Sequence, residues 1–155
     1  YKGSVKKGKK INNEITEVSE LISSASLIAV SNFEKTGLMD EELFIDGVDH
    51  EWCWRASSRM NGRFFIVETV KLSHYLGEGD RYFLWRKVPI PTPFRTYYQF
   101  RNYFTLLRRN YVPTYWKVSN GIKYVVKLFY YPLCISPRLS YLKNICKGIY
   151  DGIWG

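Results

Sequence analysis

A chain of 155 residues with 46% hydrophobic side chains is long and apolar enough to bury one compact core. Its 23 Lys and Arg outnumber 14 Asp and Glu, and the net charge of +9 favours anionic partners such as a nucleotide diphosphate, a nucleic acid or an acidic membrane. The sequence has no apolar run of about 18 residues that would predict a membrane-spanning helix. Cys53, Cys134 and Cys146 lack the paired spacing of a structural zinc site, which favours buried free thiols in a reducing cytosol.

The chain is predicted to open with a strand and a helix. Polar and apolar residues are mixed over 15–22 in a strand-like way. Ser23 and Ser24 can then cap a helix through residues 26–30, which Gly37 can end.

The next segment is predicted to hold a second helix and further extended chain. An acidic stretch over 40–46 leads into a helix from about Val48 to Met60, with two acidic residues in its first turn, as the helix dipole prefers. Residues 63–68 are β-branched and aromatic, which predicts a strand, and 70–75 can continue as a second extended piece.

The last part of the chain has a different composition and a different apolar pattern. Three prolines between 89 and 93 break regular structure. Apolar residues then recur at helical spacing over 94–107 and 115–129. Two further prolines are expected to separate these helices from a last short helix through 142–146.

These patterns predict three parts. Residues 1–14 form a basic lead-in segment, residues 15–88 an α/β portion, and residues 89–155 an aromatic and basic helical tail. Because the sequence does not begin with Met, we also expect it to start inside a longer protein.

The most informative segment is residues 37–56, which reads GLMDEELFIDGVDHEWCWRA and is followed by His74 and Gly77. It closely resembles the pattern G-x-x-D-E-x-[LF]-F-I-D-x-V-D-x-E-W-C-x-R-A, with a later H-x-x-G, of the family 2 rhamnosyltransferases. The resemblance implies the carboxyl-terminal half of a GT-A-type, Rossmann-like α/β domain followed by the helical tail. It also implies inverting transfer of a sugar, above all L-rhamnose, from a nucleotide-diphosphate donor such as dTDP-rhamnose.

Inverting transfer needs a carboxylate that removes the proton of the acceptor hydroxyl while that oxygen attacks the anomeric carbon. By the resemblance, Asp49 stands where the family's catalytic base lies. On spacing alone, Asp46 and Asp49 could both serve as helix caps. The resemblance therefore assigns Asp49 to catalysis and leaves Asp46 as a structural or acceptor-contacting residue.

The leaving diphosphate is usually held by a divalent cation such as Mg²⁺ or Mn²⁺. In the family the main metal carboxylates form an upstream Asp-x-Asp motif that this sequence lacks. We therefore expect the cation to be bound mostly upstream and the isolated chain to be inactive. His74 resembles the family histidine that reaches the metal or the diphosphate, although a lone His beside a strand can equally be an ordinary hydrogen-bonded residue.

Other residues of the segment are candidates for binding substrate. Trp52 can stack on a sugar face, whereas Trp54 points in another direction on the helix and is expected in the core. Glu51 resembles a family carboxylate that holds sugar hydroxyls or orients Arg55, and an ordinary helix pair at i,i+4 explains both residues equally well. His50 is expected to face solvent.

Ser23, Ser24 and Ala25 stand where relatives have Ser-Ser-Gly next to the donor sugar. The resemblance makes Ser23 and Ser24 candidate substrate contacts, and helix capping remains the alternative. Ala25 in place of Gly is expected to narrow the pocket or to move the backbone.

Lys117, Lys123 and Lys127 lie on the predicted 115–129 helix, away from its apolar residues. Such a helix can rest in a membrane interface with its lysines near anionic headgroups, or it can pack on the α/β portion with its lysines in solvent. The resemblance favours the membrane, because acceptors in surface polysaccharide (O-antigen) assembly are often lipid-linked at the cytoplasmic face.

A non-enzymatic basic module that binds a membrane or nucleic acid is the competing hypothesis, suggested by the charge and by 17% aromatic residues. No nucleic-acid motif is recognisable, and we expect no nucleic-acid partner. The favoured function is a cytoplasmic glycosyltransferase, peripheral to the membrane, that acts on a saccharide or lipid-linked acceptor.

Overall fold

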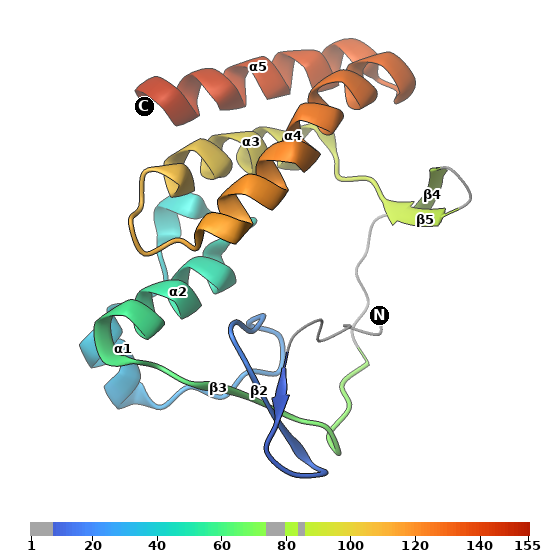
Figure 1. Cartoon of the computed structure of the whole chain (residues 1–155). Coiled ribbons are helices and arrows are strands. Elements are labelled where there is room, and N and C mark those ends of the chain that lie inside the picture. The colour runs from blue at the N-terminus through green and yellow to red at the C-terminus, as the bar shows by residue number, and fades with distance from the viewer. Residues whose placement is uncertain (1–7, 74–79, 84–85) are drawn as a thin grey trace. The chain divides into compact units, whose positions relative to one another are not determined.

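The computed structural model describes residues 8–73, 80–83 and 86–155, and the chain divides into two units (Figure 1). The first unit comprises Tyr1–Glu42 and Val48–Tyr75, and the second comprises Leu43–Gly47 and Leu76–Gly155. The predicted α/β portion and helical tail can be compared with these units. The short segment 43–47 belongs with the helices of the second unit rather than with its neighbours in the sequence.

The first unit contains a small antiparallel sheet. Strands β1 (Lys9–Lys10), β2 (Ile15–Val18) and β3 (Phe64–Val67) pair in the order β1-β2-β3. The register pairs Thr16 with Ile66. The strands predicted near 15–22 and over 63–68 are therefore present, although each is shorter than expected. Every strand pair in the described residues is antiparallel, so the structure shows a mixed α/β fold without establishing a Rossmann-like sheet.

Two helices complete the first unit. Helix α1 (Val30–Thr36) ends at Gly37, whose backbone N–H bonds to the Phe33 carbonyl oxygen. Helix α2 (Val48–Met60) has the predicted bounds and buries Trp52, Cys53 and Ala56 in the core. A single 3-10 turn, η1 (Glu41–Leu43), precedes α2.

The predicted start of α1 was wrong. The helix begins at Val30 rather than near residue 26, and Ala29, rather than Ser23 or Ser24, is its N-cap. The physical reason lies in the turn before it, where Ala25 has φ 61° and interrupts a right-handed helix. Ala25 therefore adopts the left-handed backbone that glycine tolerates best, which costs an alanine about 1 kcal/mol.

The second unit consists of three long helices and a hairpin of β4 (Asp80–Phe83) and β5 (Arg86–Pro89). The helices are α3 (Pro93–Leu107), α4 (Thr114–Cys134) and α5 (Arg138–Trp154). Thr92 caps α3 through its side chain, and a proline begins the helix. No helix in the described part of the chain is long and apolar enough to cross a bilayer.

Two predictions about the tail helices were wrong. Pro132 lies inside the last turn of α4 instead of ending it, and the helix stops two residues later at Cys134. The last helix has 17 residues instead of a short stretch around 142–146.

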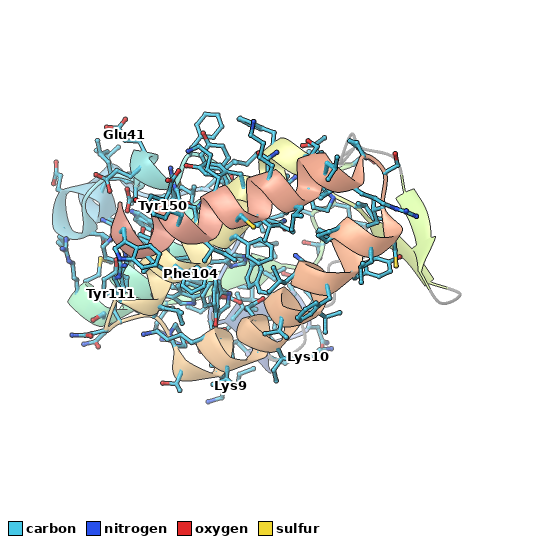
Figure 2. All side chains as sticks on the ribbon, turned by 90° about the horizontal axis from the view of Figure 1, so that it is seen from above. Lys9, Lys10, Glu41, Phe104, Tyr111 and Tyr150 are labelled. Carbon is cyan, nitrogen blue, oxygen red and sulfur yellow. The ribbon has the colours of Figure 1, made fainter. Side chains whose placement is uncertain are left out.

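The extra length of α5 follows from its packing on α3. Gly148 and Gly152 are buried on α5, and a Cβ atom on Gly148 would lie 2.4 Å from the Tyr97 carbonyl oxygen. A Cβ on Gly152 would lie 2.9 Å from Cβ of Phe104, which is labelled beside α5 in Figure 2. The two glycines let the helix backbones approach closely, so tertiary contact sustains a helix that its glycines would otherwise weaken.

The lysines of α4 are arranged differently from the prediction. The Lys117 Nζ atom donates to the carbonyl oxygens of Leu107 (2.8 Å) and Arg109 (2.9 Å). Lys127 Nζ donates to Gln99 Oε1 at 3.0 Å. Of the three lysines only Lys123 is exposed. The expectation that all three face solvent or lipid is therefore wrong for Lys117 and Lys127, because both satisfy polar groups of their own unit.

Candidate active site

Residues 37–56, which carry the family motif, are divided between the two units, and different contacts hold each part. In the second unit, residues 43–47 are fixed by Asn102, which is 2% exposed. Its amide nitrogen lies 2.7–2.9 Å from the carbonyl oxygens of Leu43, Ile45 and Asp46. Because these three carbonyls converge on one buried amide, the loop has a defined shape.

The same loop contains backbone strain. Phe44 has φ 55° and Asp46 has φ 68°, which are left-handed values for residues other than glycine. Such conformations persist only where the surroundings hold them, and they occur often at functional sites. The contacts from α3 supply that restraint here.

Asp46 forms a bidentate ion pair with Arg95 at the start of α3. Arg95 Nε lies 2.7 Å from Asp46 Oδ2, and Nη2 lies 2.8 Å from Oδ1. Both carboxylate oxygens of Asp46 are therefore engaged. The structural role that the sequence left open for Asp46 is observed, and its acceptor-contacting role stays a prediction.

Glu51 and Arg55 form the buried centre of the first unit's part of the segment. Glu51 is fully buried, and its two oxygens accept from Arg55 at 2.9 and 3.0 Å. Arg55 also donates to the carbonyl oxygens of Thr36 and Leu38, and Arg59 donates to that of Thr36. These bonds tie α2 to the carboxyl end of α1, where arginine is favoured by the helix dipole. The helix pair at i,i+4 is thus observed.

Asp49 has a different environment. It lies in the first turn of α2 and is partly exposed. Among the described residues it has no hydrogen-bond or ion-pair partner, in contrast to Asp46 and Glu51. Its carboxylate is therefore available to a substrate, while the helix fixes the direction of its side chain.

His50 does not simply face solvent, which corrects the prediction. Its Nδ1 atom lies 3.4 Å from Glu20 Oε2, and its ring stacks on Trp54 at 5.9 Å between centroids. The nearby Glu20 carboxylate raises the pKa of His50, whereas burial lowers it. Burial raises the pKa of the neighbouring Cys53 thiol to about 11, so this cysteine is an inert core residue. Cys134 and Cys146 are exposed, so the prediction of buried thiols is wrong for these two.

The other predicted substrate residues occupy varied positions. Trp52 is 3% exposed, packs against Phe33 and donates from Nε1 to the Gly37 carbonyl oxygen at 2.9 Å. A sugar could stack on it only if its ring were uncovered. Trp54 is buried, as predicted. Ser23 is exposed and Ser24 partly exposed, in the turn before α1.

The described residues do not fit a metal site. They contain no group of three or more His, Cys, Asp or Glu side chains that could hold a cation. Asp46 and Glu51 are each paired with an arginine. The predicted ligand His74 lies outside the described residues, and participation of a divalent cation remains a prediction.

Comparison with known proteins bears on the family resemblance. No family model and no solved structure matches the chain. The chain is 36% identical over 140 residues to "dTDP-rhamnosyl transferase RfbF" of Shigella flexneri. The alignment covers 88% of this chain and 46% of that relative, so the chain spans about half the relative's length. The chain belongs to the rhamnosyltransferase-like family 2 glycosyltransferases.

Proposed function

We propose that this chain forms the acceptor and base side of an inverting glycosyltransferase. The enzyme transfers L-rhamnose from dTDP-rhamnose to a saccharide or lipid-linked acceptor during cytoplasmic assembly of cell-surface polysaccharide. The name of the 36% identical relative, a dTDP-rhamnosyl transferase, supports the donor and the sugar. The motif over 37–56 supports the assignment of residues, and a GT-A-type domain remains the fold that we propose for the catalytic part.

Asp49 acts as the general base in this proposal. Its carboxylate accepts the proton of the acceptor hydroxyl, and the hydroxyl oxygen forms a bond to the anomeric carbon. The bond from that carbon to the diphosphate oxygen breaks on the opposite face, so the electron pair leaves with the nucleotide. The observation that carries this assignment is the contrast among Asp46, Asp49 and Glu51, because Asp46 and Glu51 are held by arginines and Asp49 is not.

The surrounding residues position the base. The bonds from Arg55 to Glu51 and to the end of α1 hold the first turns of α2. A fixed base is effective because orientation contributes much of an enzyme's rate enhancement. We propose that Glu51 and Arg55 are positioning residues for Asp49 and do not themselves contact the sugar.

We further propose that residues outside this chain supply most of the nucleotide site and any divalent cation, since the aligned region covers 46% of the relative. Ser23 and Ser24 remain proposed donor contacts at the edge of that site. No step of the proton transfer depends on a metal ligand in this chain.

A transfer assay tests the proposed function. The enzyme, assembled with its nucleotide-binding part, should transfer sugar from dTDP-rhamnose in preference to UDP- or GDP-linked sugars. Nuclear magnetic resonance of the product should show an anomeric configuration opposite to that of the donor. Retention of configuration, or equal use of unrelated donors, would contradict the proposal. Absence of transfer together with tight nucleic-acid binding would favour the non-enzymatic hypothesis.

A further inference from the structure

The outward face of α4 is apolar. Six of its side chains are between 54% and 66% exposed and form what we call the α4 stripe: Val118, Ile122, Val125, Val126, Phe129 and Leu133. Their spacing places them on one side of the helix, in a band about 100° wide. Such a band normally faces the protein core. Here it faces away from the described residues of its own unit.

The inward face of α4 explains why the stripe points outward. Tyr131 is 6% exposed in the core cluster with Phe100 and Ile135. On the same side, Lys117 and Lys127 bond to groups of the helical unit. Turning the stripe inward would break these hydrogen bonds and move Tyr131 out of the core cluster into solvent, which is costly. The stripe is therefore a stable surface feature of this packing.

The net positive charge of the chain lies entirely in the helical part that contains α4. Residues 93–155 contain ten Lys and Arg and one acidic residue, so they carry the whole net charge of +9, whereas residues 1–92 contain thirteen of each sign. The acidic residue, Asp151, is paired with Lys147. Helix α4 contains no acidic residue, and the exposed Lys123 adjoins the stripe.

The positive charge of this region indicates which kind of partner can bind the α4 stripe. A second copy of the chain would bring two segments of charge +9 together, and their mutual repulsion opposes association. An anionic surface with an apolar interior complements both properties, because lysines are attracted to acidic headgroups and apolar side chains insert beneath them.

We propose that the α4 stripe docks on an anionic phospholipid bilayer, with α4 lying along the interface. The six apolar side chains insert below the headgroups, and Lys123 lies near the phosphates. Lys117 and Lys127 take no part, since they are bonded within the unit. Docking of this kind is independent of which sugar the enzyme transfers, so its test does not depend on the proposed function.

Vesicle flotation with the full chain tests the proposal. The wild type should float with equimolar phosphatidylglycerol–phosphatidylcholine vesicles and much less with phosphatidylcholine alone. The double variant Ile122→Gln/Phe129→Gln should bind the anionic vesicles at least tenfold more weakly, because each substitution removes an inserted apolar group. The matched variant Val70→Gln/Leu72→Gln alters two similarly exposed residues of the first unit and should bind like the wild type.

Charge variants provide an independent readout. Lys123→Gln should weaken binding to anionic vesicles about fivefold at low salt and by less at high salt. Circular dichroism should show that the variants retain their helices, and Val118→Gln replaces the double variant if that one is unfolded. Equal binding by stripe and matched variants would overturn the proposal. So would a wild-type dimer that the stripe substitutions dissociate in sedimentation experiments, which would assign the stripe to a second copy.

Discussion

Three acidic residues of one short motif have three different environments. Asp46 is held by Arg95, Glu51 is buried against Arg55, and Asp49 is partly exposed in the first turn of α2. A carboxylate whose two oxygens both accept from an arginine is occupied, so a substrate hydroxyl would have to displace that arginine to reach it. At the scale of the residue, this difference supports the assignment of Asp49 as the base, which the motif resemblance suggested.

The buried pair leads to a stability prediction. Arg55→Met should lower the free energy of unfolding by about 3 kcal/mol, because it leaves the Glu51 carboxylate buried without its partner. Urea unfolding followed by tryptophan fluorescence measures the change, since Trp52 and Trp54 lie on the same helix. The matched variant Arg63→Met breaks an exposed bidentate pair with Glu17 and should have little effect. Equal effects of the two variants would contradict a structural role for the Glu51–Arg55 pair.

The sequence identified the candidate residues better than it identified their partners. The i,i+4 pair of Glu51 and Arg55 could be foreseen because helical spacing is local. The ion pair of Asp46 with Arg95 joins residues 49 positions apart, and no local pattern predicts such a contact. The buried role of Asn102 was missed for the same reason.

At the scale of the element, α2 was predicted accurately because the acidic residues in its first turn and the Asn61-Gly62 that follows it are local signals. The amphipathic pattern of α4 was also recognisable, but the sequence does not say which face meets the protein. Lys117, Lys127 and Tyr131 face inward. Lys117 donates to Leu107 and Arg109, Lys127 donates to Gln99, and Tyr131 packs in the core cluster. The length of α5 depended on close packing with α3, which no single-helix pattern contains.

The inward position of Lys127 predicts a pH dependence. Burial lowers the pKa of Lys127 to about 8, below its usual value of about 10.4 in an unfolded chain. Between about pH 8 and 10 the unfolded state therefore binds the larger number of protons, so this lysine should make the free energy of unfolding rise with pH. Above that window the buried tyrosines act in the opposite direction, since burial raises the pKa of Tyr131 to about 12.

Urea unfolding at a series of pH values tests this dependence. Lys127→Met should remove the rise that Lys127 contributes between pH 8 and 10. Lys123→Met, on the exposed side of the same helix, should keep most of the rise, because the Lys123 charge lowers the pKa of Lys127 less than burial does. A pH profile of the Lys127 variant that parallels the wild type would show that Lys127 has an ordinary pKa.

At the scale of the whole molecule, the sequence indicated an α/β portion followed by a helical tail, and it identified the family through the motif over 37–56. The division of that motif between two units was not predictable, because residues 43–47 associate with α3 through long-range contacts. Charge is also divided at this scale, since the helical part carries the net charge and the rest is balanced. The composition of the whole chain conceals this asymmetry.

The most direct test of the assigned chemistry is the rate of rhamnosyl transfer by Asp49→Asn, measured in the enzyme with its nucleotide-binding part. Loss of the general base should lower kcat by about 10²–10⁴-fold, while donor affinity measured by calorimetry stays close to that of the wild type. Glu34→Gln, an exposed carboxylate on α1, should retain the wild-type rate. An Asp49→Asn variant that keeps more than about a tenth of the wild-type kcat would contradict the assignment of Asp49 as the base.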